Sequence, residues 1–89
     1  MKVLIDRSFE KDTDKLTDQK LLHSIAECIE GILNADKLSD IPNCKKLKGS
    51  KHAYRIRIGD YRIGFILEKQ TIELIRFLHR SVIYNYFPK

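Results

Sequence analysis

The segment from Ala53 to Phe65, with the sequence AYRIRIGDYRIGF, constrains the fold of this chain more than any other part. Apolar and polar residues alternate on both sides of Gly59-Asp60, and a glycine followed by an aspartate suits the two-residue turn of a β-hairpin. The segment therefore predicts two antiparallel strands joined by this turn. The expected pairs are Ile58 with Tyr61, Arg57 with Arg62, Ile56 with Ile63, and Arg55 with Gly64.

Side chains on a β-strand alternate between the two faces of a sheet, so this hairpin is expected to have an apolar face and a basic face. The apolar face would carry Tyr54, Ile56, Ile58, Tyr61, Ile63 and Phe65. The basic face would carry Arg55, Arg57 and Arg62. Like charges directly opposite each other on a sheet are destabilising. We therefore interpret the basic face as a binding site for an anion.

The charge is distributed unevenly along the 89 residues, which together carry a formal net charge of +5. Residues 1–40 contain 6 basic and 9 acidic side chains, whereas residues 41–89 contain 11 basic and 3 acidic ones. A basic patch attracts polyanions because their counterions are released on binding. The alternative is the solvated surface of an ordinary basic protein, but three arginines fixed on one hairpin face favour contact with phosphate.

Length and composition indicate a single small domain over residues 1–89. No apolar run approaches the roughly 18 residues of a transmembrane helix, and the N-terminus lacks the pattern of a signal peptide. Cys28 and Cys44 form no CxxC pattern, so we expect reduced thiols, a cytoplasmic location and no contact with a membrane. Cysteine and histidine are sparse, and we expect no metal and no cofactor.

The segment before the hairpin predicts one strand and two helices. Residues 2–5 are typical of a short strand. Ser8 is expected to cap a short helix, and Thr17 is expected to cap a longer amphipathic one. Residues 35–50 contain proline and glycine and are expected to be mostly loop. The apolar positions of the longer helix are Leu21, Leu22, Ile25, Ile29, Ile32 and Leu33.

After the hairpin, residues 71–78 form a nearly continuous apolar run that is typical of a strand covered on both faces. Residues 81–88 predict a final helical turn or an extended arm. The expected fold class is therefore α+β, with the order strand, helix, helix, strand, strand, strand and a mostly antiparallel sheet. The helices would cover the apolar face of the hairpin and leave the basic face open.

These residues resemble the RelE/ParE superfamily of bacterial type II toxins over about residues 45–87. The resemblance rests on the run LKGSKHAYRIRIGDYRIGF from Leu47, on LIRFLHR from Leu74, and on Tyr84. For RelE-like members it implies a ribosome-dependent endonuclease that cleaves mRNA, and for ParE-like members it implies inhibition of DNA gyrase. Either kind is normally neutralised by a small acidic cognate antitoxin that covers the basic face.

The RelE-like motif implies a set of site residues in this chain. Its two basic strand positions, the arginine of the next strand, and the arginine and tyrosine near the C-terminus correspond to Arg55, Arg57, Arg62, Arg80 and Tyr84. RelE itself has lysines at the first two of these positions, and an arginine cannot act as a general base. The carboxylate of the YoeB-like branch corresponds to Lys45 in this chain. The resemblance therefore leaves the general base unassigned.

Metal-free RNA cleavage by a 2′-hydroxyl requires proton removal, stabilisation of the phosphorane charge, and protonation of the leaving 5′-oxygen. Arg62, Arg80 and Arg57 suit the second task, because preorganised cations stabilise developing charge. His79 is the candidate for proton transfer, since an imidazole titrates near neutrality. Tyr84 could donate a proton or stack on a base. The further candidates for RNA contact are Arg55, Lys46, Lys48, Lys51, His52 and Tyr86.

Several of these residues have structural alternatives. His79 could be an ordinary residue at a strand end, and Tyr84 could pack in the core or against an antitoxin. Arg62 could pair with Asp60, and Arg76 could pair with Glu73 or Asp60.

Two functions from different classes stay open: an mRNA endoribonuclease acting on the ribosome, and a binding protein that inhibits gyrase or lacks activity. A general RNA-binding module is disfavoured because the aromatic residues of the hairpin lie on its apolar face.

Overall fold

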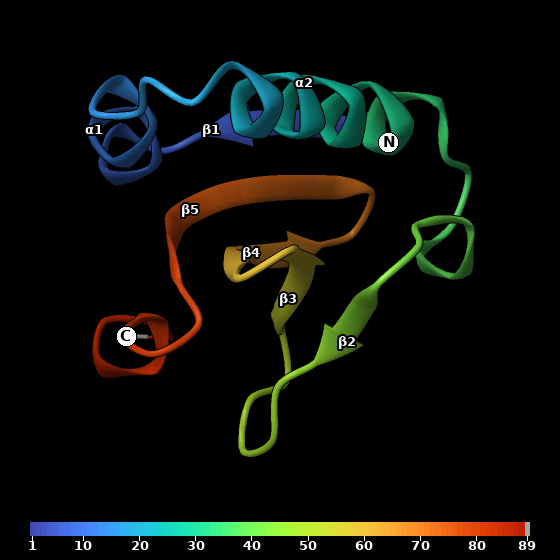
Figure 1. Cartoon of the computed structure of the whole chain (residues 1–89). Helices are drawn as coiled ribbons and strands as arrows, with labels where there is room; N and C mark the ends of the chain where they lie inside the picture. The colour runs from blue at the N-terminus through green and yellow to red at the C-terminus, as the bar shows by residue number, and fades with distance from the viewer. Residues whose placement is uncertain (89) are drawn as a thin grey trace.

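The fold is a five-stranded sheet with two helices on one face (Figure 1). A computed structural model describes residues 1–88. The elements are β1 (Lys2–Ile5), α1 (Arg7–Asp14), α2 (Gln19–Asn34), the 3₁₀ turn η1 (Leu38–Asp40), β2 (Cys44–Lys46), β3 (Ala53–Ile58), β4 (Tyr61–Glu68), β5 (Thr71–His79) and the 3₁₀ turn η2 (Ile83–Asn85). The strand order is β1-β5-β4-β3-β2, with β1 parallel to β5 and every other pair antiparallel. The predicted α+β class is confirmed.

The hairpin of β3 and β4 has the predicted register. Ile58 pairs with Tyr61, and Arg57 pairs with Arg62. Gly59 has a φ of 56°, a backbone conformation that a residue with a side chain rarely adopts. The glycine at this turn position therefore allows the two-residue connection that sets the register.

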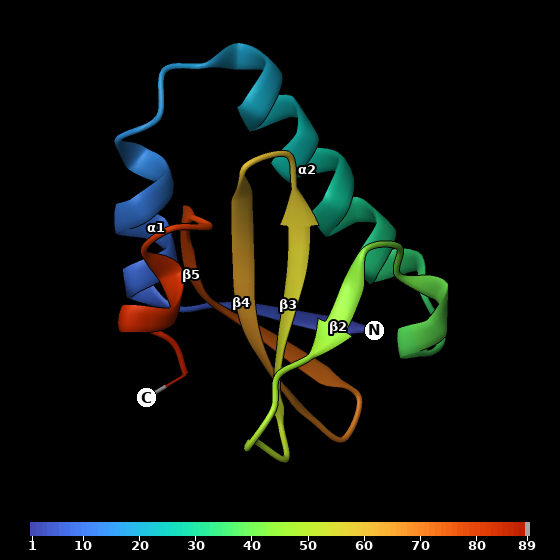
Figure 2. The same cartoon turned by 60° about the horizontal axis from the view of Figure 1, so that its bottom comes forward.

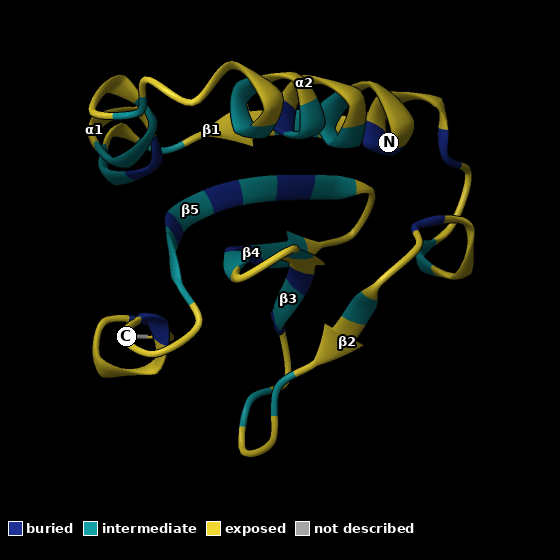
Figure 3. Cartoon of the chain, viewed as in Figure 1, coloured by how far each residue is buried: buried dark blue, intermediate teal, exposed yellow. Residues whose placement is uncertain are grey.

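The two helices cover the apolar face of the hairpin. Phe9 of α1 and Ile32 of α2 belong to one buried cluster with Ile63 and Phe65 of β4. Figure 2 looks onto the opposite face of the sheet, with α2 behind the strands. Buried and half-buried residues alternate along much of β5, as expected for a strand with both faces covered (Figure 3). Within residues 1–88 no helix has the length and apolar character needed to cross a membrane.

The predicted helix caps are wrong by one or two residues. Asp6 caps α1 by accepting the N–H of Ser8 at 3.0 Å, and Asp18 caps α2 by accepting the N–H of Lys20 at 2.9 Å. A carboxylate is favoured at a helix N-terminus because the helix dipole stabilises its negative charge. The Ser8 hydroxyl instead donates to the carbonyl of Ile75 at 2.6 Å and ties α1 to β5.

The prediction of loop for residues 35–50 misses a strand. β2 pairs antiparallel with β3, with Lys45 opposite Arg55 and Lys46 opposite Tyr54. A strand of three residues is too short for alternation of apolar and polar residues to reveal it. Its position at the edge of the sheet extends the basic face beyond the hairpin.

The C-terminal segment covers part of the basic face. Ile83 and Phe87 are buried in a second cluster with Ala53, to which the half-buried Leu47, Ile66, Ile75 and Leu78 belong. The ring of Phe87 lies so close to Gly64 that a Cβ added there would be 2.5 Å from it. The open area is therefore smaller than the sequence predicts, because residues 83–87 occupy the region around Gly64.

Candidate nucleic-acid interface

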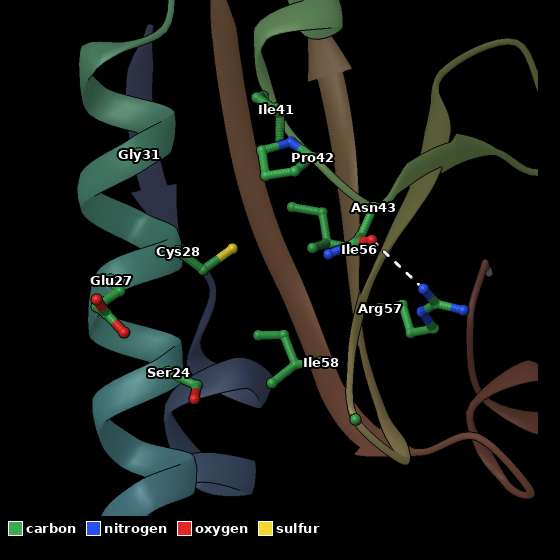
Figure 4. Close-up of a pocket in the computed structure, with 11 residues that line it drawn as sticks. Ser24, Glu27, Cys28, Gly31, Ile41, Pro42, Asn43, Ile56, Arg57 and Ile58 are labelled. Carbon is green, nitrogen blue, oxygen red and sulfur yellow. Dashed lines mark hydrogen bonds between the residues drawn. The ribbon is translucent and has the colours of Figure 1, made fainter.

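Three arginines of the hairpin form the centre of the candidate site. Arg55, Arg57 and Arg62 alternate with core residues on β3 and β4, so they project from the face opposite α2. None of the three takes part in an ion pair within residues 1–88. Arg55 Nη1 donates to the carbonyl oxygen of Asn43 at 2.8 Å, and Arg57 Nη2 lies 3.5 Å from Asn43 Oδ1 (Figure 4). These neutral partners leave the positive charge uncompensated.

Arg62 is not paired with Asp60, the alternative that the sequence left open. Its Nη1 donates to the carbonyl oxygens of Gly59 and Tyr61, both at 2.9 Å. Asp60 Oδ1 lies instead 3.9 Å from Arg80 Nε, and both side chains are exposed. The backbone N–H of Arg80 also donates to the Asp60 carbonyl at 2.8 Å. The turn end of the hairpin therefore brings Arg80 close to the hairpin arginines.

His79 lies on the other side of the sheet from these arginines. It pairs with Tyr61 across β4 and β5, and the edge of one ring faces the other at 5.5 Å. Its Nδ1 accepts the N–H of Ser81 at 3.1 Å and lies 2.8 Å from Ser81 Oγ. A nitrogen that accepts an N–H carries no proton, so a neutral His79 has its proton on Nε2. In this arrangement the Nε2–H group can donate a hydrogen bond, but Nε2 cannot accept a proton from a substrate hydroxyl.

The two tyrosines of the C-terminal segment differ in their surroundings. Tyr84 and Tyr86 are 53% and 51% exposed. Tyr86 lies beneath the guanidinium of Arg76, whose Cζ is 5.2 Å from the ring centroid. Arg76 pairs with neither Glu73 nor Asp60, the two partners that the sequence left open, because Asp12 of α1 binds it. The sequence gives no periodic signal for a contact between residues this far apart in the chain.

Of the lysines predicted to contact RNA, one lies on the α2 side of the sheet and two lie in a loop. Lys46 lies opposite Tyr54 and hence on the α2 side, whereas Lys45 lies opposite Arg55 on the basic face. Lys45 was not predicted to contact RNA, because a strand as short as β2 shows no pattern in the sequence. The exposed Lys48, Lys51 and His52 lie in the connection from β2 to β3.

The basic residues therefore extend along β3 from one end to the other. The loop of Lys48 and Lys51 precedes Ala53, and the turn of Gly59 follows Ile58. At about 3.3 Å per residue, β3 separates these two ends by roughly 20 Å. Arg55 and Arg57 lie between them. This arrangement suits an extended polyanion better than a single small anion.

A groove of about 390 Å³ lies on the opposite side of β3, between this strand and α2 (Figure 4). Cys28, Pro42, Ile56 and Ile58 contribute to its lining. Cys28 and Cys44 are free thiols, and burial raises the pKa of Cys28 to about 11. Burial also raises the pKa of Cys44. Within residues 1–88 no three histidine, cysteine or acidic side chains are grouped as metal ligands would be.

The family model for the ParE toxin of the type II toxin-antitoxin system parDE matches residues 3–84. The chain belongs to the RelE/ParE superfamily of type II toxins. Toxin RelE3 of Methanocaldococcus jannaschii is 43% identical over 89 residues, which cover 99% of this chain and 100% of that protein. This relative confirms the predicted resemblance and favours the RelE-like branch of the superfamily.

Solved structures support the same placement within the superfamily. A chain of the RelB-RelE antitoxin-toxin complex from Methanococcus jannaschii has a TM-score of 0.81 and 38% identity, covering 96% of this chain and 99% of that chain. A chain of the archaeal RelE-RelB complex from Pyrococcus horikoshii OT3 has a TM-score of 0.69 and 23% identity, covering 90% and 94%. The second likeness shows the shared fold alone.

Proposed function

We propose that this RelE-like toxin is a metal-independent endoribonuclease that cleaves mRNA on the ribosome. The observation that carries the proposal is the set of three hairpin arginines without an ion-pair partner in residues 1–88. The identity of 43% with Toxin RelE3 supports the RelE-like branch over other branches. The length of the basic face along β3 agrees with a single-stranded RNA substrate.

In this mechanism the 2′-hydroxyl of the message loses its proton to a water molecule, attacks the adjacent phosphate to form a 2′,3′-cyclic phosphate, and displaces the 5′-oxygen. Arg57, Arg62 and Arg80 stabilise the additional negative charge on the phosphorane, which is often the largest contribution to such catalysis. Tyr84 is the candidate donor to the leaving oxygen, because it is exposed on the segment that covers the basic face. Arg55, Lys45 and the loop lysines bind the flanking phosphates.

We further infer that a small acidic antitoxin neutralises the toxin by covering the basic face. RelE chains similar to this one occur in complexes with RelB. A negatively charged partner would compete directly with RNA for the same arginines, since both are polyanions.

Gyrase inhibition is the second candidate function. The matching family model is that of ParE toxins, and the arginines at positions 55 and 57 provide no general base. A gyrase inhibitor would cause DNA breaks without new mRNA ends, so the two functions can be separated in one experiment.

Substitution of Arg62 tests the enzymatic function. We expect Arg62→Ala to relieve growth arrest on expression and to lower cleavage of ribosome-bound mRNA by at least about 100-fold, the effect typical of losing one group that stabilises the transition state. The fold should persist, because Arg62 contacts backbone carbonyls at the surface. Primer extension on cellular messages after induction measures the cleavage.

Arg7→Ala is the matched control, because Arg7 is an exposed arginine in the first turn of α1, far from the hairpin in the sequence and outside the sheet. This variant should cleave like the wild type. Undiminished cleavage by Arg62→Ala would refute the site. DNA breaks without new mRNA ends in the wild type would support the gyrase function instead.

A further inference from the structure

Arg76 joins helix α1 to strand β5 through a nearly buried carboxylate. Its Nε and Nη2 donate to the two oxygens of Asp12 at 2.7 and 3.1 Å. The same carboxylate accepts the N–H of Phe77 at 3.0 Å, and the Asp12 side chain is 7% exposed. Two parallel hydrogen bonds fix the plane of the guanidinium. Because Asp12 neutralises it, Arg76 is poorly suited to bind a phosphate.

A β-bulge lies directly before Arg76 in β5. Gly64 pairs with Arg76 and Phe65 with Leu74, so Ile75 has no partner on β4. The extra residue changes the direction of the strand, as bulges do. As a result, Leu74 and Phe77 both face the helix-side core although they are three positions apart, a spacing that would place them on opposite faces of a regular strand.

The Arg76 guanidinium also contacts the C-terminal segment, through the ring of Tyr86. Tyr86 stacks on it with a distance of 5.2 Å between Cζ and the ring centroid. The buried Ile83 and Phe87 flank this tyrosine, and the carbonyl of Ile83 accepts the N–H groups of Tyr86 and Phe87, both at 2.9 Å. The segment is thus attached by a cation–π contact as well as by an apolar cluster.

We propose that Arg76 is a positioning residue for the C-terminal segment of residues 80–87. Asp12 fixes the guanidinium plane, and this plane holds Tyr86. Tyr86 in turn attaches the segment that carries Tyr84, and this segment lies on the side of β5 away from α2 (Figure 1). This inference rests on the proposed nuclease function for its effect on catalysis. It also assigns Tyr86 to the attachment of this segment, whereas the sequence suggested that Tyr86 contacts RNA.

Three substitutions test whether Arg76 and Tyr86 position the C-terminal segment or bind RNA directly. Arg76→Lys keeps the charge but loses the planar fork, Tyr86→Leu loses the aromatic ring, and Tyr86→Phe keeps it. We expect the first two to lower the single-turnover rate of mRNA cleavage by about tenfold or more, since small displacements of catalytic groups have large effects. The third should cleave like the wild type. Arg7→Lys, at an exposed position of α1, is the matched control for the lysine exchange.

A second measurement does not depend on catalysis. Amide hydrogen exchange of residues 83–87 should accelerate about tenfold or more in Arg76→Lys and Tyr86→Leu and stay unchanged in Tyr86→Phe. The double variant Arg76→Lys/Tyr86→Leu should be no worse than either single variant, because both act through one contact. The salt dependence of RNA binding should stay that of the wild type in Arg76→Gln, which removes the charge at this position, because Arg76 makes no phosphate contact.

The inference is overturned if Tyr86→Leu retains the wild-type cleavage rate and the wild-type exchange of residues 83–87. It is also overturned if Arg76→Gln, which removes the charge, weakens the salt dependence, because this would identify Arg76 as a phosphate contact. Because Tyr86 is half exposed, its substitution tests the proposal even if Arg76→Lys fails to fold. A wild-type protein that cleaves no mRNA would refute the nuclease function, while the exchange experiment would still decide the positioning.

Discussion

Single arginine residues in this toxin differ in the groups that they contact. Arg76 is neutralised by a carboxylate that is almost buried, and Arg80 lies near an exposed one. Arg55, Arg57 and Arg62 contact neutral oxygen atoms of the hairpin and of Asn43. An arginine readily exchanges a contact with a neutral oxygen for one with phosphate, because a hydrogen bond between two ionised groups is stronger than one to a neutral acceptor. Arginines that contact neutral oxygens are therefore free to bind phosphate, whereas Arg76, which contacts a buried carboxylate, has a structural role.

The thiol of Cys28 gives a prediction that depends on pH. Its pKa is raised to about 11 by burial and by the nearby Cys44. At pH 8 such a thiol is about 0.1% ionised, compared with roughly a quarter for a free cysteine. We expect iodoacetamide to label Cys28 slowly in the folded toxin at pH 8, faster as the pH rises toward 11, and rapidly in urea. Mass spectrometry of the digested protein measures the labelling.

If iodoacetamide labelled Cys28 at pH 8 equally fast with and without urea, the thiol would be accessible and ionised in the folded protein. Tryptic peptides that contain Cys28 and Cys44 can be quantified separately in the same digest. Labelling of Cys44 should follow the same order, because burial also raises its pKa.

Among the secondary-structure elements, those with long periodic patterns were predicted correctly. The hairpin has a repeated alternation and a turn glycine, and α2 has six apolar positions at helical spacing. β2 was missed because three residues cannot display a period. The covering of Gly64 by Phe87 was missed because it depends on tertiary packing, which no local pattern encodes.

The contact of Gly64 with Phe87 predicts an effect on stability. An added methyl group at Gly64 would lie 2.5 Å from the Phe87 ring, so the ring must move. We expect Gly64→Ala to lower the free energy of unfolding by about 1–3 kcal/mol, as overpacking generally does. Urea denaturation monitored by circular dichroism measures the change.

Gly31→Ala is the matched control for this substitution. Gly31 lies within α2, and a Cβ there would meet nothing within 4 Å. Alanine should therefore raise the free energy of unfolding by about 0.5–1 kcal/mol, because it favours the helix. If Gly64→Ala left the stability unchanged or raised it as Gly31→Ala does, the close packing of Phe87 on Gly64 would be refuted.

Across the whole molecule the charge is divided between two layers. Residues 1–40, with an excess of acidic side chains, form both helices and β1, whereas residues 41–89, with an excess of basic ones, supply the other four strands. The sequence therefore predicted the basic face and its arginines. It could not place His79 and Lys46 on the opposite side, because the bulge in β5 and the pairing of β2 determine their orientation.

The basic face predicts a salt-dependent affinity for RNA. We expect Arg57→Ala to reduce the slope of log K against log salt concentration by about 0.7, the value for one lost phosphate contact on a single strand. The probe is a fluorescent oligoribonucleotide with 2′-O-methyl groups, which lacks the attacking hydroxyl, and anisotropy measures binding. Arg7→Ala should leave the slope unchanged. Equal slopes for Arg57→Ala and the wild type would exclude a phosphate contact at Arg57.

The parallel pairing of β1 with β5 affects when the sheet can form during translation. Lys2 pairs with Thr71, and Ile5 pairs with Leu74. β1 can therefore form its hydrogen bonds in the sheet only after β5 has been synthesised. Contacts between such distant segments form late, since the chain between them must be ordered first. The sheet that carries the arginine surface is therefore completed only after β5 has left the ribosome, and until then β1 has no partner strand.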